Sequence, residues 1–180
     1  MPVVGYCVFD TAIGACGIAW SEDAIATCQL PEPDRASTLK RMQRRHPECE
    51  ERDPPGWVVK VIERVKALLE GAHDDLADVS LDMRGEPYFN QRVYEVTRAI
   101  PPGRTLTYGE VAQKIGEPGS ARAVGQALGH NPFAPIVPCH RVLGAGNSGV
   151  GFSATGGVDT KLKMLEIERA QLGGHPGLFD

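Results

Sequence analysis

The sequence lacks every segment that would place it in a membrane or direct its export. No run approaches the roughly 20 apolar residues of a membrane-spanning helix, and no basic residue precedes the short apolar stretch in "MPVVGYCVFD" at its start. Its 180 residues are 42% hydrophobic and 23% charged, which is ordinary globular composition. We therefore expect a soluble, non-exported protein of one or two small domains, cytoplasmic or, in a eukaryote, nuclear.

Cofactor motifs and metal-ligand spacings are also missing. There is no GxGxxG between a strand and a helix, and no phosphate loop. The cysteines are odd in number and unevenly spaced, which favours free thiols in a reducing compartment over a disulfide framework. Together with His46 and His73 they reproduce no recognisable zinc spacing. We expect no cofactor and no metal. The five cysteines are Cys7, Cys16, Cys28, Cys49 and Cys139.

A basic excess is absent as well. The formal net charge is -4; residues 1–85 hold 10 Lys and Arg against 15 Asp and Glu, and residues 86–180 hold 9 against 8. Domains that bind nucleic acid usually carry a clear basic patch. The charge balance alone therefore neither indicates nor excludes nucleic acid as a partner.

The first half of the chain has the pattern of a small antiparallel sheet with helices. Short apolar runs at 3–10, 15–20 and 24–30 are separated by turn residues, which predicts three strands. Helical spacing predicts helices over 36–46 and 54–71, and "DVSLDMRG" at 78–85 is a candidate for a further strand. A basic cluster on the first helix is followed at once by acidic "ECEERD", so we interpret it as a solvated face.

The second half has a helical pattern. An apolar stripe predicts a helix over 88–100, which Pro101-Pro102-Gly103 stops. Thr107 and Glu110 have the spacing of a capping box, so a second helix is expected from Tyr108 to Gly116, and a third opens near Ser120. The prediction is an α/β (α+β) fold: an N-terminal domain over 1–84 and a mostly helical, winged-helix-like domain with a helix-turn-helix over 85–180.

The third helix is slim on nearly every side. Small side chains let a backbone approach its surroundings closely, and two explanations stay open at this point. Either the helix packs tightly in the core, or it enters a narrow DNA groove with Arg122 reaching forward from its N-terminal end. The small residues are Ala121, Ala123, Gly125, Ala127 and Gly129.

Cys139 stands in "PIVPCHRVLG", directly before His140. A thiol with a pKa of about 8.5 is a nucleophile only when deprotonated, so it needs a partner. In an extended segment neighbouring side chains point to opposite faces, so His140 would act through a water or a bend. Glu166 or Glu168 from a final helix could orient the imidazole. A buried structural cysteine is the open alternative.

The run "TYGEVAQKIGEPGSARAVGQALGHNPFAPIVPCHRVLG" together with "GFSATGGVDTKLKMLEIE" resembles the O6-alkylguanine-DNA alkyltransferases, the methylated-DNA–protein-cysteine methyltransferase family. The likeness covers about residues 86–170, and the N-terminal half resembles the family's ribonuclease-H-like domain only in outline. It implies DNA repair by direct reversal. An alkyl group passes irreversibly, once per molecule, from O6 of a flipped-out guanine, with O4 of thymine as an alternative, to the cysteine.

The resemblance implies a role for each matching residue. Cys139 accepts the alkyl group, His140 deprotonates it through a water, and Glu168 orients His140. Asn131 links the recognition helix to the active-site segment. Tyr108 helps to rotate the nucleotide and protonates the leaving guanine.

The resemblance also implies the surfaces that meet DNA and the base. Arg122 is the finger that fills the space left by the extruded nucleotide, and the protein engages the minor groove of double-stranded DNA that contains O6-alkylguanine. We also expect a monomer, because no large apolar segment of the sequence is left unassigned. The DNA-binding helix further presents Ser120, Ala121, Ala123 and Gly125. The base pocket is formed by Pro138, Val142, Phe152 and Ser153.

Two rival functions remain at this stage. A damage-sensing module would bind alkylated DNA and leave Cys139 unmodified. A cysteine hydrolase with a Cys-His-Glu relay would turn over many times, but the slim helix and Arg122 have no role in it. The presence of Cys139 favours repair over binding alone.

Overall fold

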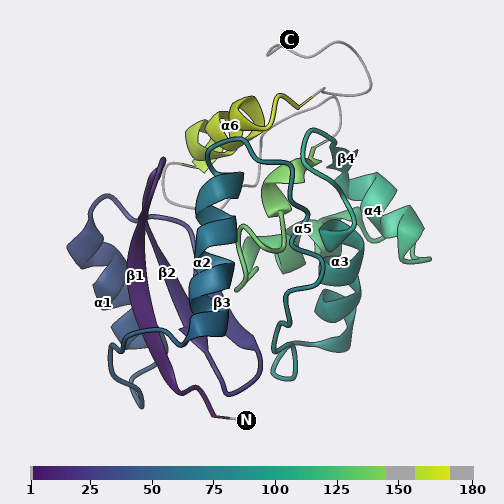
Figure 1. Cartoon of the computed structure of the whole chain (residues 1–180). Coiled ribbons are helices and arrows are strands. Elements are labelled where there is room, and N and C mark those ends of the chain that lie inside the picture. Colours follow the sequence, from purple (N-terminus) through teal and green to yellow (C-terminus); the bar gives the residue numbers. More distant parts are fainter. Residues whose placement is uncertain (1, 145–156, 171–180) are drawn as a thin grey trace.

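The computed structural model describes residues 2–144 and 157–170. The chain runs from a three-stranded sheet with two helices into a cluster of helices (Figure 1). The elements, in chain order, are β1 (Gly5–Thr11), β2 (Gly14–Trp20), β3 (Ile25–Gln29), α1 (Arg35–Arg45), α2 (Gly56–Leu68), α3 (Tyr88–Arg98), β4 (Leu106–Thr107), α4 (Tyr108–Lys114), α5 (Ala121–Gly129), a 3-10 turn (Cys139–Arg141), β5 (Val142–Leu143) and α6 (Gly157–Ile167).

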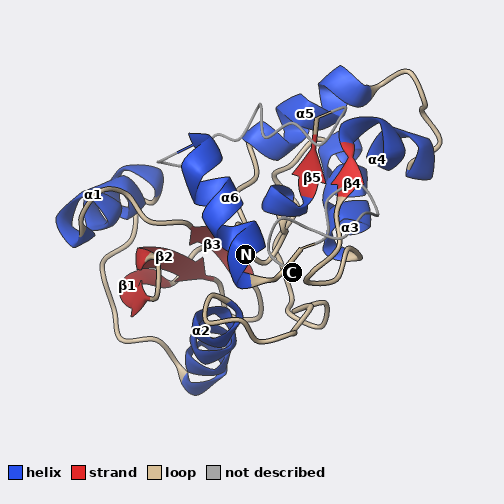
Figure 2. Cartoon of the chain, turned by 90° about the horizontal axis from the view of Figure 1, so that it is seen from above, coloured by secondary structure: helices blue, strands red, loops and turns tan. Residues whose placement is uncertain are grey.

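The three predicted strands form an antiparallel sheet in the order β1-β2-β3. Helices cover both of its faces, α1 on one side and α2 on the other (Figure 2). Tyr6 and Ala19 pack with Met42 of α1, whereas their neighbours Cys7 and Ile18 join the core under α2. Burial on both faces explains why β1 and β2 are apolar at nearly every position rather than at every second one.

Gly17 shows how closely α1 approaches the sheet. A Cβ at this position would lie 2.6 Å from the Met42 sulfur. Met42 is fully buried, so it has little room to withdraw. The small residue in β2 is therefore required for α1 to rest on the strand.

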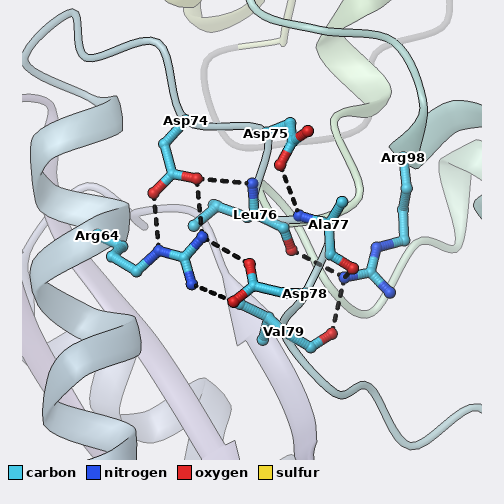
Figure 3. A network of polar contacts seen from close by, with 8 residues as sticks. All are labelled: Arg64, Asp74, Asp75, Leu76, Ala77, Asp78, Val79 and Arg98. Carbon is cyan, nitrogen blue, oxygen red and sulfur yellow. Dashed lines mark hydrogen bonds and ion pairs between the residues drawn. The ribbon is translucent and has the colours of Figure 1, made fainter.

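The segment at 78–85 does not form the predicted strand. It makes one isolated bridge, Leu81 with Ile25 of β3. The preceding loop is held by side chains instead: Arg64 of α2 binds the carboxylates of Asp74 and Asp78, and Arg98 of α3 donates to backbone carbonyls (Figure 3). The strand prediction was wrong here, because the pairing with β3 stops at this one bridge and the Val79 carbonyl accepts from Arg98 instead of from a neighbouring strand.

The loop joins the two halves of the chain. The guanidinium of Arg98 on α3 contacts the carbonyl oxygens of Leu76, Ala77 and Val79. Arg64 on α2 binds Asp74 and Asp78 of the same loop, so helices from both halves hold it. The largest apolar cluster likewise contains residues of both halves. The division into domains at residue 84 stays a prediction.

The helix-turn-helix is formed as the capping box predicts. The Thr107 hydroxyl accepts from the Glu110 amide, and the Glu110 carboxylate accepts from the Thr107 amide. Gly116, with φ +79°, turns the chain out of α4, and α5 then packs against α4 and α3. Within the described residues, no helix is long and apolar enough to cross a membrane.

Candidate active site

Cys139 opens a 3-10 turn rather than lying on an extended strand, which corrects the prediction from sequence. Pro138 has φ -82° and ψ 68°, the conformation at the centre of an inverse γ-turn, and the Cys139 amide donates to the Val137 carbonyl at 2.8 Å. The chain therefore turns sharply just before the thiol. Cys139 and His140 lie on this bend and do not alternate across a pleat.

Asn131 fixes the turn from the side of the recognition helix. Its Nδ2 donates to the Val137 carbonyl at 2.8 Å, and its Oδ1 accepts from the Phe133 amide at 2.9 Å. Since α5 ends at Gly129, the asparagine is the first side chain beyond the helix that reaches the active-site segment. The segment that follows α5 is thereby hydrogen-bonded to the residues that precede the thiol.

His140 and Glu168, 28 positions apart, meet in the interior. His140 Nε2 lies 2.8 Å from Glu168 Oε1, and the side chains are 1% and 3% exposed. A carboxylate can only accept, so Nε2 carries the proton and Nδ1 is left with the lone pair. Burial lowers the pKa of His140 and the charge of Glu168 opposes that effect. A neutral imidazole that carries its proton on Nε2 can take up a further proton at Nδ1 and is suited to act as a general base.

The cysteine is buried, with 9% of its surface exposed. Burial raises the pKa of Cys139, whereas a hydrogen bond from Asn131 and the positive charge of Lys161 lower it. Lys161 is buried in α6, its Nζ donates to the Val142 carbonyl at 2.6 Å, and burial lowers its pKa to about 8. The site therefore places a cation where a thiolate would need one.

Tyr108 stands at the first position of α4, half-buried beside the site. The Lys161 ammonium lies 5.7 Å from the centre of its ring. Burial raises the pKa of Tyr108, and the charge of Cys139 adds to the rise, so the phenol keeps its proton. A Cβ on Gly125 of α5 would come within 4.0 Å of the same ring.

The helix α5 uses only part of its slim surface for packing. Val124, Ala127 and Leu128 are buried, whereas Arg122 is exposed and Ala121, Ala123 and Gly125 are partly exposed. Tight packing therefore explains one face of the helix. The other face leaves small residues and Arg122 accessible at its N-terminal turn, where Ser120 is the N-cap.

The predicted base pocket is described only in part. Pro138 and Val142 are buried on either side of the 3-10 turn. Phe152 and Ser153 lie outside the described residues. Among the residues that are described, no three His, Cys, Asp or Glu side chains gather in a way that could hold a metal ion.

Arg141 and Lys161 are buried residues of this site that sequence reasoning did not select. Arg141 donates to both oxygens of Glu168, at 3.0 and 2.7 Å. Two signals could have found them. Arg141 is a charge inside the apolar run "PIVPCHRVLG", and Lys161 precedes Glu168 by seven residues, two helical turns, on the same face of the final helix.

The family profile described as 6-O-methylguanine DNA methyltransferase, DNA binding domain, matches residues 88–170. A methylated-DNA–protein-cysteine methyltransferase of Mycobacterium bovis is 44% identical over 126 residues, which are 70% of this chain and 74% of the relative. The chain belongs to this family. A methyltransferase of Methanothermobacter thermautotrophicus is 33% identical over 88% of this chain and 81% of its own.

Solved structures of the methyltransferase family match the whole fold. The crystal structure of Mycobacterium tuberculosis O6-methylguanine methyltransferase has a TM-score of 0.72 at 35% identity and covers 98% of this chain and 99% of its own. The Mycobacterium tuberculosis OGT structure in complex with DNA has the same TM-score and identity, with 98% and 100% covered. The resemblance and the α/β fold class predicted from the sequence are thereby confirmed.

Proposed function

We propose that this chain repairs alkylated DNA by direct reversal, with Cys139 as the acceptor of the alkyl group from O6 of guanine. The observation that carries the proposal is the buried cluster in which the thiol stands on a bend before His140, His140 is held by Glu168, and Lys161 lies nearby. A thiolate at neutral pH needs a base, which is His140, a group that orients this base, which is Glu168, and a nearby cation, which is Lys161.

The transfer balances without a cofactor. The thiol proton moves through a water to Nδ1 of His140, and the thiolate sulfur attacks the alkyl carbon. The new S–C bond forms as the C–O6 bond breaks, and the electron pair stays on the guanine oxygen. The Tyr108 phenol protonates the leaving guanine and recovers a proton from the imidazolium. Because the product is a thioether with no ready route to hydrolysis, each molecule acts once.

The substrate base has to leave the duplex to reach the thiol. Extrusion of a nucleotide costs a few kcal/mol, less at a damaged pair. The accessible face of α5 suits insertion into the minor groove, with Ser120, Ala121, Ala123 and Gly125 at the backbone and Arg122 in the vacated space. Pro138 and Val142 would line the base pocket together with Phe152 and Ser153. The proposed unit is a monomer on double-stranded DNA, with separate N-terminal (1–84) and C-terminal (85–180) domains.

A pair of cysteine variants tests the proposal. Cys139→Ser is expected to keep the affinity for a duplex carrying O6-methylguanine and to lose alkyl transfer altogether, measured as the methyl groups moved from DNA to protein in a single turnover. Cys49→Ser is the matched control, since this half-exposed thiol lies outside the cluster. Transfer that persists in Cys139→Ser would show that another residue is the acceptor.

A further inference from the structure

Arg141 is among the largest fully buried side chains among the described residues, with 1% of its surface exposed. A buried guanidinium is costly unless it is paired and hydrogen-bonded. Here each of its three nitrogens donates: Nε donates to Glu168 Oε2 at 3.0 Å, Nη2 donates to Glu168 Oε1 at 2.7 Å, and Nη1 donates to the Ile100 carbonyl at 2.8 Å. The first two bonds form a two-pronged contact with a single carboxylate.

We propose that Arg141 is a positioning residue for alkyl transfer, which holds the Glu168 carboxylate so that His140 keeps its proton on Nε2 and presents Nδ1 to the thiol. The inference rests on the proposed function of Cys139. It assigns a role to a residue that does not touch the substrate and acts on the thiol through two others.

The geometry makes Glu168 the shared centre of the cluster. Its Oε1 accepts from His140 Nε2 at 2.8 Å and from Arg141 Nη2 at 2.7 Å. Glu168 follows the last residue of α6, so its side chain could otherwise rotate about several bonds. The planar fork of the guanidinium fixes the carboxylate plane, and thereby the direction from which His140 can be bound.

The same guanidinium ties this carboxylate to the rest of the fold. Its bond to Ile100 reaches the end of α3, just before the bend at Gly103. A Cβ on Gly103, which has φ +87°, would lie 3.4 Å from the Glu168 backbone carbonyl. The end of α6, the bend after α3 and the 3-10 turn with the thiol therefore meet at Arg141.

Arg141 also helps to keep the Glu168 carboxylate ionised. Burial alone would raise the pKa of Glu168, but His140 and Arg141 hold it at about 2, so the carboxylate stays ionised. An ionised carboxylate accepts from Nε2–H, whereas a protonated one could donate to the ring and favour the other tautomer. A lysine would supply the charge but not the fork that spans both carboxylate oxygens and Ile100.

The test uses Arg141→Lys and Arg141→Met, with free O6-benzylguanine as substrate so that base extrusion plays no part. For both variants we expect the single-turnover rate constant at saturation to fall by on the order of tenfold or more, because losing control of a histidine tautomer is expensive in comparable relays. Nitrogen-15 spectra of labelled histidine should show His140 as the Nε2–H tautomer in the wild type and a mixture in the variants.

A double-mutant cycle distinguishes a positioning role of Arg141 from a general loss of structure in its variants. If Arg141 acts through Glu168, Arg141→Met should cost less than about twofold when added to Glu168→Gln, since coupled residues are not additive. Losses that multiply, or an Arg141→Lys rate equal to wild type with an unchanged tautomer, would overturn the inference.

Two controls keep the outcome interpretable. The wild-type spectrum needs no variant to fold, and an Nδ1–H tautomer for His140 would contradict the inference by itself. Wild-type protein that is never alkylated at Cys139 would instead contradict the proposed function. A reactive wild type whose Arg141 variants react at the same rate would contradict only the positioning role.

Discussion

Replacing Glu168 by glutamine should destabilise the protein by about 3 kcal/mol at pH 7. The pKa of Glu168 falls from its ordinary 4.5 to about 2 in the folded state, and this gap corresponds to about 3 kcal/mol at 1.36 kcal/mol per tenfold change. A second argument gives a similar size. The change leaves the fully buried Arg141 without its counter-ion, and breaking such a pair typically costs about 3–5 kcal/mol.

The sign of the pH dependence follows from the direction of the pKa change. A depressed carboxyl pKa stabilises the fold fully above the unfolded value of 4.5, and this contribution is lost as the pH falls toward about 2. The free energy of unfolding from urea titrations should therefore differ most between wild type and Glu168→Gln at pH 7. The difference should narrow between pH 4.5 and 3, because protonated Glu168 resembles the amide.

Glu166→Gln is the matched control for this experiment. Glu166 lies in the last turn of α6, two positions before Glu168, and is exposed. Its replacement should change the free energy of unfolding by no more than about 0.5 kcal/mol at any pH. A loss below about 1 kcal/mol for Glu168→Gln at pH 7, or a difference that does not narrow in acid, would refute the reasoning.

Three further substitutions probe the site. Arg122→Ala should slow repair of duplex DNA by on the order of tenfold or more, since extrusion costs a few kcal/mol, and leave the reaction with free O6-benzylguanine unchanged; equal losses would count against the finger role. Lys161→Met removes a charge that lowers the pKa of Cys139, so the pH profile of alkylation should move to higher pH; an unmoved profile would contradict this. Tyr94→Phe deletes a hydrogen bond from the phenol to the Ala127 carbonyl and should cost about 1 kcal/mol in urea unfolding; full stability would exclude that contribution.

Local sequence patterns predicted most of the fold because the signals were local. The Thr107 and Glu110 capping box marked the start of α4 within one residue, and three apolar runs gave three strands. The 78–85 segment pairs with β3 only at the bridge of Leu81 with Ile25, and its Val79 carbonyl accepts from Arg98, whose position depends on the tertiary fold. Propensity cannot register a side chain that reaches in from another helix.

The site was predictable in its members but not in its geometry. Cys139 and His140 were singled out from their own sequence context and Glu168 was preferred over Glu166 through the family resemblance, and the structure brings His140 and Glu168 into contact. The sequence favoured an extended segment and kept a bend only as an alternative, because the pattern of the run does not register a turn centred on Pro138. Arg141 was passed over because charged residues are usually exposed, and only its three buried acceptors explain its position.

The central claim is most directly tested by intact and peptide mass spectrometry after incubation with a duplex that carries one O6-methylguanine. Direct reversal at Cys139 predicts a gain of one methylene mass, confined to the peptide that contains Cys139 and saturating at one per protein. An unmodified protein that still retains the lesion-bearing duplex would contradict it and would favour a module that binds damage without repairing it.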